Sequence, residues 1–405
     1  MANIRVLEAF SGIGAQAKAI ANFQKAKQKF FEIVATVDWD ARSIITYAQI
    51  HHNVLSDVEK ILEENLLNSR EKINSFLKNF ELSLDSKRPS KIISKNLSFK
   101  KILVASIIKS KNLGSITNLN LEEINSLSPD FVTYSFPCQG LSIANMGRAN
   151  GIFDKNSTSS LIWNVYSLIK GLKNKPKYLL MENVPNLISK KFISQYKKWK
   201  ETLEQEGYKT FTTTLNGLNF GSIQKRNRVF AISFLKEIKT PFESDLEFEK
   251  YILNLGQNVW NDLHRRKQIF ESIFNFDSKN SENTGFLINA TPSRIKMTEH
   301  AEKINESKNF IIRTLTTKQD RNPNTGIIKF ENDLADKLNY RFISNREAFR
   351  LMGFENNDFE KLKPLISKNI LTKESLYRQA GNSIIVTILE ALINLIYKID
   401  KENFG

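Results

Sequence analysis

The chain has 405 residues, a formal net charge of +16 and a single cysteine. One cysteine excludes an internal disulfide, one cysteine with four scattered histidines does not make a zinc site, and we expect neither a secretory signal nor a bilayer-crossing run. The positive surplus favours a polyanionic partner, with nucleic acid first, although a solvated basic surface is the alternative.

The start of the chain alternates strands and helices. Residues 4–10 predict a strand that runs into a glycine turn at 11–14 and then a helix with regularly spaced apolar residues. Residues 31–38 predict a second strand, and 41–51 predict a helix. A strand, a glycine turn and a helix are the opening unit of a doubly wound, Rossmann-like α/β fold.

The middle of the chain is less regular. Residues 53–112 are polar and lysine-rich, and we expect them to form an insertion on the surface of the sheet. Residues 130–136 and 177–183 predict further strands, with an amphipathic helix at 161–172 between them. The stretch 139–160 is rich in Gly, Asn and Ser, which predicts a mobile loop.

Two more strands and two strong helical patterns complete the set of predicted elements. Residues 209–216 and 228–235 predict an antiparallel pair, and 345–354 and 383–399 have helical spacing.

A weakly patterned region separates these two groups of elements. Residues 238–340 are charged and Asn-rich with few long apolar runs, which indicates a second, smaller domain. The larger domain then spans 1–237 and is completed by 341–405.

Polar or reactive residues come directly after four predicted strands. These are the glycine turn after the first strand, Asp38 after the second, and Cys138 and Glu182 after later ones. Ligands of open α/β sheets bind beyond the carboxyl ends of the strands, so the coincidence predicts a site there.

Each feature near the first two strands has two interpretations. FSGIG (10–14) can let a ligand approach the backbone, or it can be an ordinary strand–helix turn. Asp38 can accept hydrogen bonds from ribose hydroxyls, or it can cap the next helix. Trp39 can stack on a base, or it can simply be packed.

The later residues also have two interpretations. Cys138 is either a buried, inert thiol or a nucleophile in an open loop. Glu182 is either a working carboxylate or a capping or ion-paired one. Gln224, Arg226 and Arg228 share one face of a strand-like segment, which suits either an anionic ligand or a solvated edge strand.

Seven short motifs occur in one order along the chain: FSGIG, DW, FPCQGLS, MENV, QKRNR, TLTT (314–317) and AGNSI (380–384). This set and its order resemble the DNA cytosine-5 methyltransferases over nearly the whole chain. The composition and the lysine-rich LSLDSKRPS (82–90) look most like the CG-specific enzymes of mollicute bacteria. The resemblance implies a doubly wound methyltransferase sheet, with 238–340 as the target-recognition domain.

The resemblance also implies a chemistry. The thiolate of Cys138 would attack C6 of cytosine, which makes C5 nucleophilic toward a methyl donor. Glu182 would hold N3 and the exocyclic amine of the base. Arg228, supported by Arg226 and Gln224, would contact O2 and the cysteine loop.

The implied cofactor is S-adenosylmethionine, with S-adenosylhomocysteine as product and no metal. The implied cofactor contacts are Phe10, Ser11, Gly12, Ile13, Gly14, Asp38, Trp39, Ser115, Ile116, Pro137, Leu161, Asn382 and Ser383. One position departs from the family pattern, because GSI (114–116) stands where many members have GDI. Ser115 can accept only a weaker, neutral hydrogen bond from the adenine amine.

The implied substrate is a cytosine swung out of a DNA duplex, because a thiol cannot reach C6 within the stack. The loop 139–160 would close over the DNA. The implied DNA contacts are Gln139, Ser142, Ala144, Asn145, Arg148 and Thr314. Sequence reading would fall to 238–340, with CG as the expected target.

The resemblance further implies a monomeric bacterial cytoplasmic protein, associated with the nucleoid rather than a membrane. Its partner would be double-stranded DNA, with a cognate restriction endonuclease as a functional partner. Two alternatives stay open: a cytosine-5 methyltransferase that acts on RNA such as tRNA, and a catalytically silent DNA-binding relative.

Overall fold

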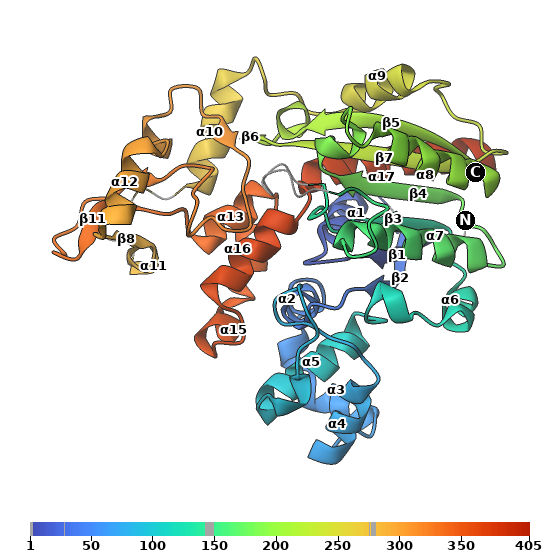
Figure 1. The fold of residues 1–405 in the computed structure, drawn as a ribbon, viewed down its shortest axis with the longest axis horizontal. Coiled ribbons are helices and arrows are strands. Elements are labelled where there is room, and N and C mark those ends of the chain that lie inside the picture. Colours follow the sequence, from blue (N-terminus) through green and yellow to red (C-terminus); the bar gives the residue numbers. More distant parts are fainter. Residues whose placement is uncertain (1–2, 28, 142–149, 275, 277–280) are drawn as a thin grey trace. The chain divides into compact units, whose positions relative to one another are not determined.

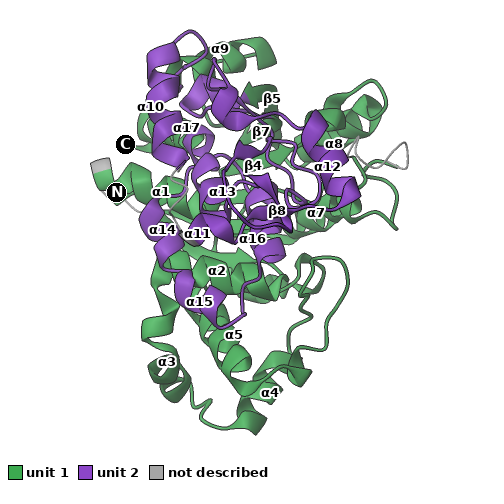
Figure 2. Cartoon of the chain, turned by 90° about the vertical axis from the view of Figure 1, so that its left-hand side faces the viewer, with its two compact units in different colours: residues 1–215, 227–255, 390–405 green, residues 216–226, 256–389 purple. Residues whose placement is uncertain are grey.

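The structure is a computed structural model that describes residues 3–27, 29–141, 150–274, 276 and 281–405. The chain divides into two compact units, coloured separately in Figure 2. Unit 1 comprises 1–215, 227–255 and 390–405, and unit 2 comprises 216–226 and 256–389. This division differs from the expected domain boundaries, because residues 341–389 group with unit 2.

Unit 1 is built on a six-stranded sheet with the order β2-β1-β3-β4-β7-β5 (Figure 1). The strands are β1 (Ile4–Ala9), β2 (Phe31–Val37), β3 (Phe131–Tyr134), β4 (Tyr178–Asn183), β5 (Tyr208–Asn216) and β7 (Asn227–Leu235). Strands β2, β1, β3 and β4 are mutually parallel, and β7 runs antiparallel to β4. The predicted α/β sheet is therefore confirmed, including all six of its strands.

Helices cover both faces of this sheet. They are α1 (Ala15–Ala26), α2 (Ala41–His52), α6 (Leu121–Leu127), α7 (Ile162–Gly171), α8 (Ile193–Gln205), α9 (Asp245–Leu255) and α17 (Val386–Phe404). Leu7 and Met181 belong to a buried cluster with side chains of α6, α7 and α8. Side chains alternate along a strand, so Glu8 and Tyr178 face the other side. There Glu8 meets Tyr47 of α2, and Tyr178 meets Asp400 of α17.

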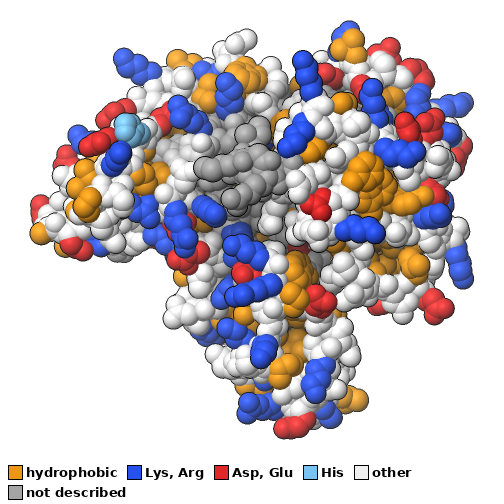
Figure 3. Space-filling view, viewed as in Figure 1, with side chains coloured by type: hydrophobic (Ala, Val, Ile, Leu, Met, Phe, Trp, Pro, Cys, Tyr) orange, Lys and Arg blue, Asp and Glu red, His pale blue; other side chains and the backbone are white. Residues whose placement is uncertain are grey.

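The predicted insertion is a helical lobe of unit 1. It contains α3 (Val58–Glu64), α4 (Arg70–Lys78) and α5 (Leu97–Lys109), and α5 packs against α2, α3 and α4. On the face shown in Figure 3, Lys and Arg side chains are spread over this lobe and also occur on other parts of the surface.

Unit 2 combines short strands with helices. The strands are β6 (Gln224–Lys225), β8 (Leu287–Asn289), β9 (Ile312–Arg313), β10 (Ile328–Lys329) and β11 (Lys337–Arg341). Strands β10, β11 and β8 form one sheet, and β6 pairs in parallel with β9. The helices are α10 (Leu263–Ile273), α11 (Ser281–Thr284), α12 (Pro292–His300), α13 (Asn345–Leu351), α14 (Asn356–Glu360), α15 (Lys363–Ser367) and α16 (Lys373–Asn382).

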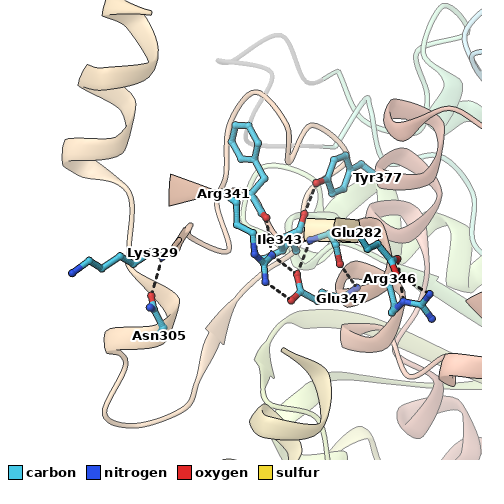
Figure 4. Close-up of polar contacts among 10 residues, drawn as sticks. Glu282, Asn305, Lys329, Arg341, Ile343, Arg346, Glu347 and Tyr377 are labelled. Carbon is cyan, nitrogen blue, oxygen red and sulfur yellow. Dashed lines mark hydrogen bonds and ion pairs between the residues drawn. The ribbon is translucent and has the colours of Figure 1, made fainter. Parts of the chain in front are cut away.

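A buried ion pair links β11 to α13 in unit 2 (Figure 4). Both terminal nitrogens of Arg341 donate to Glu347 at 2.8 Å, and the two side chains are 0% and 2% exposed. Glu347 also accepts from the backbone N–H of Ser344 at 2.6 Å, which completes a capping box at the start of α13. The hydroxyl of Tyr377 on α16 donates to the carbonyl of Ile343 beside it.

One helical segment is apolar enough to cross a membrane by length and composition. It is Lys373–Phe404, and most of its apolar part is buried inside the structure. The expectation that no such run exists was therefore wrong as regards length and composition, since the helical segment Lys373–Phe404 is long and apolar enough. Its burial has a structural cause, because α17 covers one face of the sheet through contacts such as that between Tyr178 and Asp400.

Candidate active site

Cys138 lies in a tight turn just beyond the carboxyl end of β3. The backbone N–H of Leu141 donates to the carbonyl of Cys138 at 2.9 Å, which closes a turn over 138–141. The cysteine is partly exposed, so the interpretation as a fully enclosed thiol does not hold. Pro137 is also partly exposed, and Gln139 is exposed at the tip of the turn.

Ser159 fixes this turn from behind. Its buried hydroxyl donates to the carbonyl of Pro137 at 2.7 Å and accepts from the N–H of Gly140 at 3.0 Å. A Cβ at Gly140 would lie 2.0 Å from Oγ of Ser157, so a larger residue would require Ser157 to move. Sequence reasoning missed Ser159, since its polar partners lie about twenty residues earlier in the chain.

Two asparagines join the cysteine turn to the end of β4. The side-chain amide of Asn183 donates to the carbonyl of Phe136 at 2.9 Å, and that of Asn186 donates to the carbonyl of Leu141 at 2.6 Å. Asn183 directly follows Glu182 in the motif MENV, which was the one available signal for its role. These bonds hold the segments that carry Cys138 and Glu182 side by side.

Glu182 and Arg228 form an ion pair in unit 1. Glu182 pairs with Phe230 across β4 and β7, so Arg228, two residues before Phe230, points to the same face. Nε of Arg228 lies 3.1 Å from Oε1 of Glu182, with side-chain exposures of 15% and 10%. The guanidinium compensates a carboxylate that would otherwise be costly to remove from water.

Gln224 and Arg226 lie in unit 2 and do not continue the strand of Arg228. The N–H of Arg226 donates to the carbonyl of Gln224 at 2.9 Å. This bond closes a tight turn, which separates β6 from β7. The predicted continuous strand face was therefore wrong. Both side chains are buried, which also rules out a solvated edge strand at these two positions.

The guanidinium of Arg226 joins three segments of unit 2. It donates to the carbonyls of Leu315, Gly381 and Ser383 at 2.9, 2.9 and 3.0 Å. Gln224 adds to this link, because its side-chain oxygen accepts from the N–H of Leu315 at 2.9 Å. The motifs QKRNR, TLTT and AGNSI thus meet around one buried arginine.

The TLTT and AGNSI motifs approach each other closely. A Cβ at Gly381 would lie 2.6 Å from the backbone of Thr316. Thr314 is partly exposed, and its hydroxyl donates to the carbonyl of Lys225 at 2.8 Å. Asn382 is exposed at the end of α16, whereas Ser383 is buried.

The FSGIG turn has an unusual backbone. Phe10, Gly12 and Gly14 all have left-handed φ angles, of 56°, 55° and 79°. A Cβ at Gly12 would meet nothing closer than 4.0 Å, so there is open space above this residue, while one at Gly14 would lie 2.3 Å from His51. Ser11 and Ile13 are buried beneath the turn. Space over a glycine at a strand end fits a bound cofactor.

Asp38 ties this turn to the end of β2. One carboxylate oxygen accepts from the N–H of Gly12 and the other from the N–H of Asp40, both at 2.8 Å. Burial raises the pKa of Asp38 to about 6. The helix-cap interpretation of Asp38 is wrong, because Asp40 caps α2 by accepting from Arg42 and Ser43. Trp39 is partly exposed beside it.

The remaining predicted residues are spread over several segments. Ser115 is partly exposed, and its hydroxyl contacts that of Thr117 at 2.7 Å. Ile116 is buried, and Leu161 is partly exposed at the end of a 3-10 turn (Thr158–Leu161). The predicted DNA contacts Ser142, Ala144, Asn145 and Arg148 lie outside the described residues. Within the described ranges, no group of three His, Cys, Asp or Glu side chains is arranged to hold a metal ion.

Sequence reasoning missed a buried carboxyl in β1, just before the FSGIG turn. Glu8 of β1 is 0% exposed and accepts from the hydroxyl of Tyr47 at 2.6 Å. Burial raises its pKa to about 7.

The chain matches known proteins over its full length. The family described as C-5 cytosine-specific DNA methylase matches residues 75–398. The type II methyltransferase M2.ScrFI of Lactococcus lactis subsp. cremoris is 32% identical, over 98% of this chain and 99% of its own. The orphan methyltransferase M.SssI of Spiroplasma monobiae is 31% identical, over 97% of both chains. The crystal structure of an S. pombe Dnmt2 methyltransferase covers 100% of both chains with a TM-score of 0.65 and 18% identity, a likeness of fold.

Proposed function

Because this chain belongs to the C-5 cytosine-specific DNA methylases, we propose that Cys138, Glu182 and Arg228 are its catalytic groups. The protein is a DNA cytosine-5 methyltransferase, as the family and the type II relatives establish. When bound, S-adenosylmethionine supplies the methyl group, and the residues of this chain activate and hold the base that receives it.

The proposed reaction begins with the thiolate of Cys138. Its sulfur bonds to C6 of the cytosine, and the electron pair displaced from the C5–C6 double bond makes C5 nucleophilic. After C5 gains the methyl group, loss of the C5 proton restores the double bond and expels the thiolate. Glu182 holds N3 and the exocyclic amine of the ring, and Arg228 stabilises the charge that builds up on it.

The ion pair between Glu182 and Arg228 carries this proposal. The pair lies at the end of β4, and Asn183 bonds the end of that strand to the segment just before Cys138. A partly exposed thiol, a buried carboxylate and a guanidinium at one edge of a sheet suit a flat heterocycle better than a purely structural role. We assign Arg226 and Gln224 to positioning, because both bond to main-chain groups of unit 2.

We propose that the cofactor lies over the FSGIG turn. Gly12 has room above it, Asp38 would meet the ribose and Trp39 the adenine. The remaining proposed contacts are Phe10, Ser11, Ile13, Gly14, Ser115, Ile116, Pro137, Leu161, Asn382 and Ser383.

We propose a flipped-out cytosine of a short duplex site as the substrate, with CG as its sequence. Gln139, exposed at the tip of the cysteine turn, and Thr314 would contact this DNA. The protein would work as a monomer in the bacterial cytoplasm, with a restriction endonuclease as a functional partner.

One experiment tests both substrate class and target. The protein is incubated with labelled S-adenosylmethionine and either random-sequence duplex DNA or total tRNA, and the methylated positions are mapped. We expect 5-methylcytosine in duplex DNA at CG. Methylation confined to tRNA, or DNA methylation at another site, would contradict the proposed target.

A further inference from the structure

A segment outside the seven motifs lies against two parts of the proposed cofactor site. Residues 80–90 belong to the helical insertion and come after α4. They contact residues 39–42, just beyond β2, and also Gly114. Trp39 and Ser115 are proposed to meet the adenine, so this segment contacts both stretches of chain that carry the proposed adenine contacts.

The first contact is a short piece of strand-like pairing. The N–H of Ser83 donates to the carbonyl of Trp39 at 2.7 Å, and the N–H of Ala41 donates to the carbonyl of Ser83 at 2.8 Å. Arg42 donates from its side chain to the carbonyl of Leu84 at 2.9 Å. These bonds fix the main chain of the Trp39–Ala41 stretch, from which the indole projects.

A side-chain contact reinforces this pairing. The hydroxyl of Ser86 donates to one carboxylate oxygen of Asp40. The other oxygen of Asp40 accepts from the N–H groups of Arg42 and Ser43, both at 3.0 Å, and so caps α2. Asp40 is 3% exposed, so the loss of the Ser86 hydroxyl would leave one of its oxygens less satisfied.

The second contact is made with the GSI turn. Gly114 has a left-handed φ of +78°, and a Cβ there would lie 3.0 Å from the ring of Phe80. Further along the same turn, the side chain of Asn118 donates to Glu81 at 3.4 Å. The ring of Phe80 therefore covers the start of the GSI turn, where Ser115 replaces the aspartate of the family pattern.

The turn is ordered by its own bonds. One oxygen of Asp85 accepts from the N–H of Lys87 at 3.0 Å and from that of Arg88 at 3.3 Å. Ser83 is fully buried, and its hydroxyl donates to the carbonyl of Arg88 at 2.7 Å. Because residues 83–88 are held by these bonds, they form a rigid support for the residues that they contact.

We infer that residues 80–90 are a supporting wall of the cofactor site, in which Ser86 and Phe80 are positioning residues for the adenosine part. The inference rests on the proposed cofactor site. Residues 80–90 would then help to set the affinity for the cofactor, although they lie outside the FSGIG, DW and GSI segments. The segment acts through Trp39 and the 114–116 turn, which lets it compensate for the neutral Ser115.

The test measures binding without DNA and without turnover. Dissociation constants for S-adenosylhomocysteine and 5′-methylthioadenosine are determined by calorimetry for wild type, Ser86→Ala and Phe80→Leu. For Ser86→Ala, which loses one hydrogen bond, we expect a roughly 3- to 10-fold weaker affinity, equal for the two ligands. For Phe80→Leu, which loses a ring contact, we expect a weaker affinity for both ligands as well. Turnover at saturating cofactor and affinity for DNA should not change.

Ser94→Ala is the matched control, because Ser94 lies in the same insertion and its hydroxyl donates locally to the carbonyl of Lys91. Equal affinity in Ser86→Ala, Phe80→Leu and Ser94→Ala would overturn the inference. Phe80→Leu changes the contact with the GSI turn and leaves the contact with Asp40 in place. The inference can therefore still be tested if Ser86→Ala does not fold. Wild-type protein that binds neither ligand would instead overturn the proposed cofactor site.

Discussion

Nε of Arg228 lies 3.1 Å from Oε1 of Glu182, on the same face of two antiparallel neighbouring strands. Each side chain is at least 85% buried, so the pair is largely shielded from solvent. The arginine offsets part of the cost of burying the carboxylate and contacts one of its two oxygens. The next residue, Asn183, attaches the end of β4 to the segment just before the cysteine turn, because its side chain donates to the carbonyl of Phe136.

Glu182→Gln should lower turnover by about 10²- to 10³-fold, because one group that stabilises charge on the base is lost. Affinity for duplex DNA should stay close to that of wild type. Single-turnover methylation and filter binding measure the two effects separately. Unchanged turnover would remove Glu182 from the reaction.

Cys138→Ala should abolish the covalent intermediate. A duplex with 5-fluorocytosine at the mapped target cannot lose the C5 substituent as a proton, so the wild-type adduct should survive denaturation. Electrophoresis under denaturing conditions shows the adduct directly. Its persistence in Cys138→Ala would assign the nucleophile to another residue.

The position of the proposed site was predictable because parallel strands end at one edge of the sheet. The glycine turn, Asp38, Cys138 and Glu182 each come at the end of an apolar run, and the structure places those runs in one sheet in which β2, β1, β3 and β4 are parallel. Local pattern and one topological rule were enough for this part.

The supporting residues were not predictable, because their partners are distant in the sequence. Arg226 bonds to carbonyls 89, 155 and 157 residues away, and backbone carbonyls leave no trace in residue identity. The period-two pattern of QKRNR therefore suggested one strand face where the chain actually turns. Ser83 was missed for the same reason, since its bonds to residues 39 and 41 are made by its backbone.

Arg226 and Arg228 should respond differently to the same substitution. Arg226→Lys loses the planar fork that reaches three carbonyls, and we expect it to lower stability by about 2–3 kcal/mol. Arg228→Lys keeps a cation beside Glu182, so it should retain stability but lower turnover. Thermal unfolding and steady-state assays compare the two. Equal melting temperatures for both variants would contradict the positioning role of Arg226.

The ion pair of Arg341 with Glu347 should contribute far more to stability than its exposed neighbours. Glu347→Ala leaves a fully buried guanidinium without its carboxylate, which should cost about 3–5 kcal/mol. Glu360→Ala removes a half-exposed partner of Arg346 and should cost at most about 1 kcal/mol. Urea unfolding of both variants measures the difference in stability. Similar midpoints would show that the burial of Arg341 and Glu347 does not make the loss of this ion pair more costly.

Glu8 should make the protein less stable as the pH rises toward neutrality. Its pKa is raised by burial from 4.5 to about 7, so between these values the folded state holds a proton that the unfolded state has released. Stability therefore falls through this window and levels off above pH 7, with a total loss of up to about 3 kcal/mol.

Glu8→Gln keeps the shape and a hydrogen-bond acceptor for Tyr47 but cannot ionise. The difference in unfolding free energy between Glu8→Gln and wild type should thus grow in favour of the variant from about pH 5 to pH 7 and stay constant above that. Asp38 also titrates in this window, with a pKa of about 6, but it is present in both proteins and cancels in the difference. A difference that does not change with pH would mean that Glu8 is already ionised in the folded protein, with its charge stabilised by more than the hydroxyl of Tyr47.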